Sequence, residues 1–235
     1  MSAWAAKRFW KSAQPEPCDG GFTVRLDARA VKTPAKQPLV LPTFAMAQEI
    51  AAEWDQQQGL IKPDTMPLTR AANSAIDKVA PQIDGVVDEI ANYGTTDLLC
   101  YHATSPQPLI DRQAARWTPL LDWARDTLDA PLVVTQGVIP VPQPAVSLTT
   151  LRAHVAAHSP FQLAALHDLV AISGSLILGL AVTRRRLSGA EAFALSRIDE
   201  AWQNELWGED EDAARLEALR RDAFLTAERF FALCG

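Results

Sequence analysis

Residues 169–182 read LVAISGSLILGLAV, the longest apolar stretch in the chain, and they decide its fold class. A helix that spans a bilayer needs about 20 predominantly apolar residues. This stretch is shorter, the segment 173–175 (SGS) interrupts it, and Asp168 and Arg184 lie at its two ends. It therefore predicts a helix buried at the centre of a helical domain, and it argues against a membrane-embedded segment.

Capping signals on both sides of this stretch predict further helices. Residues 159–162, SPFQ, form a capping box with proline at the first helical position, which should open the apolar helix. Residues 188–191, SGAE, form another capping box, which should open a helix that runs toward Gly208. Pro119 should kink or split the helix that contains it. Helices are also expected over 81–93, 108–128 and 209–233.

The first forty residues have β character. Residues 22–26, FTVRL, alternate apolar and polar side chains, a pattern that is typical of a half-buried strand. Turn-forming residues at 18–21 precede it, and two more short strands are expected over 30–33 and 39–41. A lone hairpin is only marginally stable in water, so this small sheet must pack against another element.

Two predicted helices follow these strands and can support the sheet. Thr43 is a suitable N-cap, and Ala47, Ile50 and Trp54 recur at helical spacing on one face. A second helix is expected over 68–79. We therefore expect both helices to pack on the sheet.

Together these elements predict an α+β fold with two domains. Residues 1–79 should form a small N-terminal domain with short antiparallel strands and one or two helices, and residues 80–235 a larger all-α domain. The segment 131–144 is the one late stretch with β character. It either packs on the N-terminal sheet or forms a strapped loop in the helical part, and the sequence does not decide between the two.

Composition excludes several classes of protein. The chain has 235 residues, of which 48% are hydrophobic, and a formal net charge of -6, so a disordered chain is excluded and nucleic acid is not the expected partner. Cys18, Cys100 and Cys234 lie far apart. This spacing argues against a disulfide or zinc framework and for a reducing compartment.

A search for catalytic motifs finds none. Neither nucleotide-binding glycine motif is present. His154 and His158 share a helix face but lack the intervening glutamate of a zinc protease motif. Ser173 and Ser175 lie in an apolar helical run, unlike the serine of a hydrolase elbow. The sequence therefore predicts no catalytic residue, no metal site and no cofactor, and hence a protein that is not an enzyme.

The segment 199–208, DEAWQNELWG, combines acidic and aromatic residues at helical spacing. One stripe holds Asp199, Trp202 and Leu206, and the neighbouring stripe ends at Trp207. Such a mixture suits contact with another protein. A solvated helix face above a tryptophan core explains the same pattern, so both interpretations remain open at this point.

Ten short motifs follow one another along the chain in a distinctive order. They are residues 8–11 (RFWK), 26–29 (LDAR), 32–35 (KTPA), 52–57 (AEWDQQ), 61–63 (IKP), 66–69 (MPLT), 75–77 (AID), 97–101 (DLLCY), 174–178 (GSLIL) and 199–208. In this order they resemble the family of F-type ATP synthase assembly chaperones specific for the alpha subunit, which comprises the mitochondrial assembly factor and its alphaproteobacterial relatives. The resemblance covers nearly the whole chain.

The resemblance implies a two-domain chaperone that holds the free, unassembled alpha subunit until the beta subunit replaces it. The pair Asp199 and Glu200 matches an acidic position in the family motif. We expect the partner-binding surface in the C-terminal domain, around Asp199, Glu200, Gln203 and Glu205. Three tryptophans are expected to be structural: Trp54, which should pack the first helix against the sheet, together with Trp202 and Trp207.

Eukaryotic family members are mitochondrial. Here the motif at 8–11 begins too near Met1 to leave room for a presequence, so we expect a bacterial cytoplasmic protein. Two other functions stay open as alternatives. One is a general holdase that binds any unfolded chain, and the other, less favoured, is a small-molecule enzyme with an unrecognised site.

Overall fold

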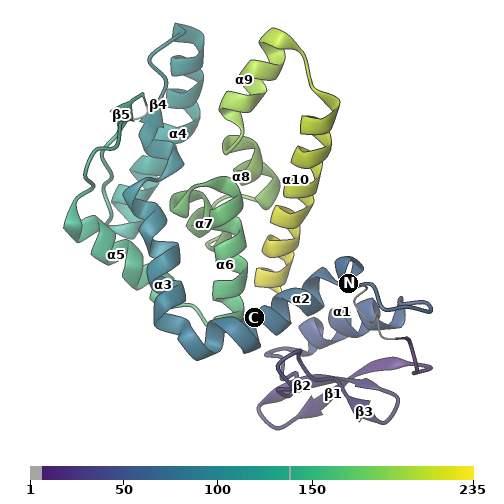
Figure 1. Ribbon diagram of the computed structural model, residues 1–235. Coiled ribbons are helices and arrows are strands. Elements are labelled where there is room, and N and C mark those ends of the chain that lie inside the picture. Colours follow the sequence, from purple (N-terminus) through teal and green to yellow (C-terminus); the bar gives the residue numbers. More distant parts are fainter. Residues whose placement is uncertain (1–6, 138) are drawn as a thin grey trace. The chain divides into compact units, whose positions relative to one another are not determined.

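The computed structural model describes residues 7–137 and 139–235, which form two compact units (Figure 1). The N-terminal unit comprises the residues up to Ile83 together with 159–165 and 229–235. The helical unit comprises 84–158 and 166–228. The division near Ile83 is close to the boundary expected from the sequence. The expected division into 1–79 and 80–235 placed 159–165 and 229–235 in the helical domain, whereas these residues belong to the N-terminal unit.

The N-terminal unit contains a three-stranded antiparallel sheet in the order β1-β2-β3. Strand β2, Gly21–Leu26, confirms the strand predicted at 22–26. It pairs with β1, Ala13–Cys18, and with the two-residue β3, Arg29–Ala30. Strand β1 was not among the predicted strands, because it contains two prolines, at 15 and 17, and proline is unusual in strands. An edge strand tolerates proline, since one of its sides needs no ladder hydrogen bonds.

The residues after β3 follow the sheet without forming further strands. The strand expected at 30–33 begins within β3, which includes Ala30, and beyond it only Lys32 forms a bridge, with Pro38. The strand expected at 39–41 is reduced to one bridge, between Leu41 and Phe22. Leu41 lies so close to the sheet that a Cβ atom added to Gly21 would come within 2.3 Å of its carbonyl oxygen. The chain therefore pairs with the start of β2 beside its glycine, where no side chain obstructs the close approach.

Helix α1, Phe44–Asp55, packs on this sheet. Thr43 is its N-cap, as predicted, and its Oγ1 accepts a hydrogen bond from the Met46 backbone N–H at 3.1 Å. Met46 and Ile50 are fully buried in a core that also contains sheet residues such as Val24. After α1 come the 3-10 turn η1 (Pro63–Thr65), α2 (Pro67–Ser74), the π-helical η2 (Ala75–Val79) and the 3-10 turn η3 (Ala80–Gln82).

The helical unit is built almost entirely from helices. In chain order they are α3 (Ile83–Asn92), the 3-10 turns η4 (Tyr93–Thr95) and η5 (Leu98–Cys100), α4 (Gln107–Leu128), α5 (Ala145–Ala156), α6 (Pro160–Ser173), α7 (Leu176–Thr183), α8 (Gly189–Leu195), α9 (Ile198–Trp207) and α10 (Glu211–Ala232). The long helices α6 and α10 each contribute residues to both units. No helix in the described part of the chain is long and apolar enough to cross a membrane.

The apolar stretch at 169–182 is buried, but it is not one helix. Gly174, at φ +72°, ends α6, and Ser175 then caps α7 by accepting the Leu178 N–H at 3.0 Å. All residues of α7 from Leu176 to Val182 are buried. The prediction of a single helix was wrong because the glycine adopts a left-handed conformation that an α-helix cannot continue.

A buried carboxylate organises this break. Asp97 accepts hydrogen bonds from the Ser175 hydroxyl at 2.7 Å and from the backbone N–H groups of Leu99 and Ile177, both at 3.0 Å. Burial raises the pKa of Asp97 to about 6, and the hydrogen bonds oppose that rise. The motifs at 97–101 and 174–178 are therefore two halves of one structural contact.

Two other helix predictions need correction. Pro119 does not split its helix into two, because α4 runs as one helix from Gln107 to Leu128 with Pro119, which is exposed, inside it. The helix opened by Ser188 does have the predicted capping box, but it stops at Leu195, and α9 begins a separate helix at Ile198.

The segment 131–144 lies in the helical unit. Its strand β5, Thr135–Gln136, pairs in parallel with β4, Tyr101–His102, and forms no part of the N-terminal sheet. Of the two alternatives left open by the sequence, the strapped loop is therefore the correct one. The side chain of Gln143 holds this loop by bonding both the N–H and the carbonyl oxygen of Val133, at 2.8 and 2.9 Å.

Candidate functional site

The first turn of α9 carries the acidic residues singled out in the sequence, and α4 fixes the first of them. Asp199 Oδ1 accepts a hydrogen bond from Gln113 Nε2 at 2.6 Å. Gln113 is only 1% exposed, and its Oε1 in turn accepts the Ala103 backbone N–H at 2.7 Å. Carboxylates in a first helical turn also interact favourably with the helix dipole. The position of Asp199 is thus set by two helices.

Glu200 is held from the segment that precedes α9. Arg197 donates to Glu200 Oε1 at 2.9 Å, to the Ile172 carbonyl oxygen at 2.7 Å and to Ser196 Oγ at 3.2 Å. The Arg197 side chain is only 14% exposed, whereas about half of the Glu200 side chain is exposed. The arginine is therefore part of the structure, and it presents the glutamate at the surface.

Asp199, Glu200 and Gln203 line one cavity of about 280 Å³. Trp117 of α4 forms part of its wall, and its indole Nε1 is engaged by the Leu195 carbonyl oxygen at 2.9 Å. The structure thus brings three of the four predicted partner-binding residues to one place. The remaining lining residues are Leu98, Ser173, Ser196 and Arg197.

Glu205, the fourth predicted residue, lies outside this cavity and pairs with α4. Arg112 donates to both of its carboxylate oxygens, at 2.6 and 2.8 Å. The same guanidinium lies 4.8 Å from the ring centroid of Trp202, a cation–π contact. Trp202 is half-buried in this arrangement. The bonds from Arg112 lower the pKa of Glu205.

Burial shapes the electrostatics of the cavity. It raises the pKa of Asp199; the negative charge of Glu200 adds to that rise, and the hydrogen bond from Gln113 opposes it. Burial also lowers the pKa of nearby His102. The ring centroids of His102 and Trp117 lie 5.6 Å apart in an edge-on arrangement. The Nε2 atom of His102 is enclosed and has no hydrogen-bond partner among the described residues. The surroundings thus disfavour both the ionised aspartate and the protonated histidine.

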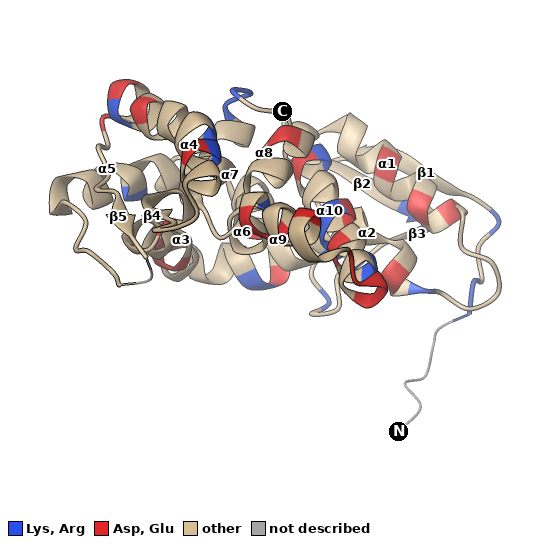
Figure 2. Ribbon diagram, turned by 90° about the horizontal axis from the view of Figure 1, so that it is seen from above, with Lys and Arg blue, Asp and Glu red and all other residues tan. Residues whose placement is uncertain are grey.

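Trp207 does not have the packing role expected for it. Its side chain is 78% exposed, at the end of α9, and Leu206 beside it is also exposed. Four successive acidic residues, 209–212, follow between α9 and the first turn of α10 (Figure 2). The segment is helical as its spacing predicts, but no other part of the described chain packs over Trp207 at this end of α9.

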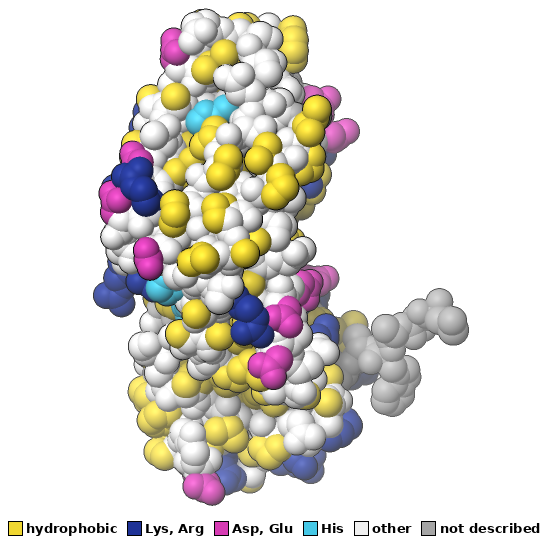
Figure 3. All heavy atoms as spheres, turned by 90° about the vertical axis from the view of Figure 1, so that its left-hand side faces the viewer, with side chains coloured by type: hydrophobic (Ala, Val, Ile, Leu, Met, Phe, Trp, Pro, Cys, Tyr) yellow, Lys and Arg dark blue, Asp and Glu magenta, His cyan; other side chains and the backbone are white. Residues whose placement is uncertain are grey.

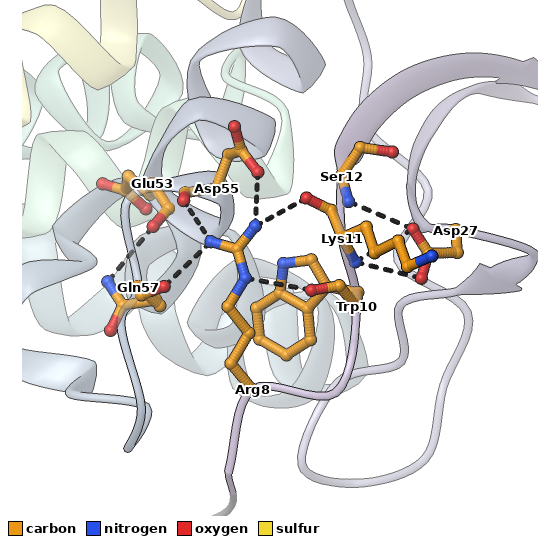
Figure 4. Close-up of polar contacts among 8 residues, drawn as sticks. All are labelled: Arg8, Trp10, Lys11, Ser12, Asp27, Glu53, Asp55 and Gln57. Atoms are coloured by element: carbon orange, nitrogen blue, oxygen red, sulfur yellow. Dashed lines mark hydrogen bonds and ion pairs between the residues drawn. The ribbon is translucent and has the colours of Figure 1, made fainter.

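The motifs of the N-terminal unit form a structural cluster around Arg8 (Figure 4). The Arg8 guanidinium donates to the carbonyl oxygens of Trp10, Lys11 and Gln57 at 2.8–3.0 Å, and it pairs with the Asp55 carboxylate at 2.9 Å. Its Cζ atom lies 5.4 Å from the centroid of the Trp10 ring. The motifs at 8–11 and 52–57 therefore join the start of the chain to the end of α1.

Trp54 belongs to the same cluster. The ring centroids of Trp54 and Trp10 lie 5.3 Å apart in an edge-on arrangement, and Trp54 packs against the core of the N-terminal unit. The neighbouring Glu53 accepts the backbone N–H groups of Leu68 and Thr69 at 2.7 and 2.8 Å. This explains the motif at 66–69 as the start of α2, held by a carboxylate from α1.

The last pair of motifs in this unit is joined by an aspartate. Asp77 accepts hydrogen bonds from the Thr33 hydroxyl at 2.6 Å and from the Ala35 backbone N–H at 3.0 Å. The motifs at 32–35 and 75–77 are thus one contact between the loop after β3 and η2. In this unit the motifs hold secondary-structure elements together.

The residues examined for catalysis have structural partners. Ser175 caps α7, and the Ser173 hydroxyl donates to the Leu169 carbonyl oxygen at 2.7 Å. His154 contacts the Leu128 carbonyl oxygen at 3.0 Å. Within 7–137 and 139–235, His, Cys, Asp and Glu side chains form no group of three or more that could hold a metal ion.

Sequence reasoning missed the residues that support the acidic segment. Arg112, Gln113 and Trp117 lie on α4, and Arg197 directly precedes α9. Polar residues are common on long helices, so nothing in the sequence around α4 marks these residues as special. Gln113 and Asp199 are 86 residues apart along the chain, too far for a local pattern to connect them. Only the packing of α4 against α9 reveals them.

Comparison with known proteins places the chain in a family. A family model described as ATP12 chaperone protein matches residues 7–125. The mitochondrial protein atp12 of Schizosaccharomyces pombe is 24% identical over 225 residues, which cover 90% of this chain and 77% of the yeast protein. The crystal structure of Atp12 from Paracoccus denitrificans is 54% identical, covers 99% of this chain and 100% of its own, and superposes with a TM-score of 0.95. An aspartate-to-lysine mutant of P. denitrificans Atp12p, also 54% identical and with full coverage of both chains, gives a TM-score of 0.96. The chain therefore belongs to the ATP12 chaperone family, and it is a chaperone of ATP synthase assembly, as the order of its sequence motifs indicates.

Proposed function

We propose that this chaperone binds the free alpha subunit of the F-type ATP synthase and prevents its aggregation until the beta subunit replaces it. The observation that carries the proposal is the clustering of Asp199, Glu200 and Gln203 around one cavity at the start of α9. We further propose that it acts in the bacterial cytoplasm and catalyses no reaction. The family membership supports the chaperone role, and the geometry of α9 supports the binding surface.

The α9 surface has the features of a protein-binding site. Arg197 and Arg112 hold Glu200 and Glu205 in fixed positions, so little side-chain entropy is lost when a partner binds. The exposed Leu206 and Trp207 add apolar area beside these charges. Tryptophan is enriched among residues that dominate binding energy, and charges at the rim confer specificity. A partner with a basic and apolar surface would match it.

A general holdase remains the second candidate, because a different face of the helical unit carries exposed apolar side chains (Figure 3). Ile139 and Val146 are each 76% exposed, and Val133 and Val134 are also exposed. Patches of this kind bind apolar surface with little selectivity. They lie in the loop around β5 and at the start of α5, and none of them lines the cavity.

A refolding assay separates the two candidates. Denatured alpha subunit, beta subunit and an unrelated aggregation-prone protein are each diluted into buffer with the purified chain, and light scattering is followed. The proposal expects suppression of aggregation for the alpha subunit only, and release of that subunit when folded beta subunit is added. Equal protection of all three proteins would contradict it and favour the general holdase.

A further inference from the structure

The cavity at the start of α9 contains a carboxylate whose charge is not balanced by a neighbouring cation. Asp199 accepts its hydrogen bond from the neutral amide of Gln113 and, among the described residues, takes part in no ion pair. Arg197, the cation of the cavity wall, is already paired with Glu200. His102 also lies near enough for a positive charge on it to favour the Asp199 carboxylate, but burial lowers the pKa of His102 and disfavours its protonated form. With His102 neutral, two carboxylates and one guanidinium leave one negative charge in excess.

This carboxylate is also partly removed from water. Burial raises the pKa of Asp199, which means that the surroundings penalise its ionised form. A positive group placed in the cavity would reverse that penalty, because opposite charges at close range favour each other most strongly where water is excluded. The other two acids of the segment do not compete, since Arg197 and Arg112 already engage them.

The size and walls of the cavity suit a single side chain. Its volume of about 280 Å³ lies just below the range of roughly 300–1,000 Å³ typical of pockets for drug-sized ligands. Leu98 and the ring of Trp117 offer apolar surface to a methylene chain, and Gln203 adds a polar group. Long basic side chains combine an apolar stem with a charged head in this way.

We propose that the cavity receives one basic side chain, an arginine or a lysine, from the client protein, with the cationic group against the Asp199 carboxylate. This inference rests on the proposed function, because it names the chemistry by which α9 recognises the free alpha subunit. Glu200, which also lines the cavity, then adds a second carboxylate beside the inserted side chain.

The variant Asp199→Asn tests this inference directly. Asparagine keeps the shape of the side chain and can still accept the bond from Gln113, but it carries no charge. Capture of the alpha subunit should weaken at least tenfold, while the melting temperature should stay unchanged or rise, because a penalised buried charge is gone. A purely structural aspartate would give the opposite pattern, with a lower melting temperature and unchanged affinity. Asp222→Asn, the same change at an exposed position of α10, is the control and should alter neither.

A small probe separates this inference from the proposed function. N-acetyl-arginine amide and its neutral analogue N-acetyl-citrulline amide are titrated into the full chain labelled with nitrogen-15. Arginine, and not citrulline, should shift the amide signals of Leu98, Asp199 and Gln203, and Asp199→Asn should abolish those shifts. Equal shifts with citrulline, or arginine shifts that survive in Asp199→Asn, would overturn the basic side-chain site.

The two experiments also fail in different ways. If arginine binds as expected but the alpha subunit is not captured by the unmodified chain, the proposed function fails and the cation site stands. If the alpha subunit is captured equally well by the unmodified chain and by Asp199→Asn, the cation site fails and the proposed function stands.

Discussion

Arg112 of α4 and Glu205 of α9 are joined by two parallel hydrogen bonds, of 2.6 and 2.8 Å, across 93 residues of sequence. The same guanidinium covers Trp202. Because this fork fixes the direction in which α9 leaves its first turn, it connects the packing of the helical unit to the surface proposed to bind the client.

The first prediction concerns this fork. Glu205→Gln removes the charge and one of the paired acceptors, while Arg112→Ala also uncovers Trp202. Both variants should capture the alpha subunit less well, and Arg112→Ala should lower the urea midpoint of unfolding more than Glu205→Gln, because exposed ion pairs by themselves contribute little. Chemical denaturation followed by circular dichroism measures this order. Equal loss of stability in the two variants would show that the cation–π contact is unimportant.

Charge reversal at Glu200 should separate binding from stability. Glu200→Lys breaks an ion pair whose glutamate is about half exposed, and Arg197 keeps its bonds to the Ile172 carbonyl oxygen and to Ser196 Oγ. The free energy of unfolding should therefore change by no more than about 1 kcal/mol, while alpha-subunit capture is lost. Asp88→Lys is the control, since it also reverses one carboxylate and breaks its ion pair with an arginine, Arg152. It should leave capture intact. If Glu200→Lys instead melts well below the control, Glu200 is structural.

Trp54→Arg should unfold or strongly weaken the N-terminal unit. The new cation would lie among the partly buried residues around Trp10 and beside the Arg8 guanidinium, so we expect a cost of about 2–4 kcal/mol. Trp54→Phe is the control, because it keeps an aromatic ring against Trp10, and the Trp54 indole Nε1 has no hydrogen-bond partner in the described structure. Urea denaturation measures both. A similar cost for both variants would contradict the charge explanation.

Asp97 should make stability depend on pH in a recognisable direction. Its pKa is about 6 in the folded chain, against an ordinary value of 3.8 for an aspartate, so between these pH values the folded state binds more protons than the unfolded state. The contribution of this carboxyl to the free energy of unfolding should therefore fall as the pH rises from about 4 to 6, by up to roughly 3 kcal/mol.

The test is the difference in unfolding free energy between the unmodified chain and Asp97→Asn, measured at several pH values. The unmodified chain should become less stable relative to Asp97→Asn as the pH rises from about 4 to 6. A shift in its favour would mean that the bonds from Ser175, Leu99 and Ile177 outweigh burial and stabilise the ionised form.

Two glycines should respond oppositely to the same substitution. Gly174 has φ +72° at the break between α6 and α7, so Gly174→Ala should destabilise the chain by about 1–2 kcal/mol through backbone strain. Gly85 lies inside α3, and a Cβ atom there would meet nothing within 4 Å. Gly85→Ala should therefore stabilise by about 0.5–1 kcal/mol. Thermal unfolding of the two variants gives the signs, and a loss of stability in both would contradict the role assigned to the Gly174 backbone.

Local signals predicted much of the fold. The alternation at 22–26, the Thr43 cap and the capping box at Ser188 all correspond to observed features. Each depends on interactions between residues that are close in the sequence, so each can be predicted from the sequence alone. The failures are also local. Prolines disguised β1, and the left-handed conformation of Gly174 could not be told from an ordinary helical glycine.

The candidate site is a different case. The acidic and aromatic composition of 199–208 was visible in the sequence, and family resemblance gave it a role. The cavity itself was not visible, because its walls come from η5, α4, α6, the turn between α8 and α9, and α9 itself. Neither was the exposure of Trp207, since helical periodicity defines a stripe and not what lies against it.

The amino-acid sequence by itself determined the α+β class, most helix starts, the family motifs and the acidic segment, because these follow from short-range chemistry and from motif order. Only the tertiary structure decided that Asp199 lines a cavity whose arginine, Arg197, is paired with Glu200 instead. It also decided that Arg112 holds Glu205 and that β5 joins β4 in the helical unit. These features depend on which distant side chains pack together, and burial, charge pairing and cavity shape arise only from that packing.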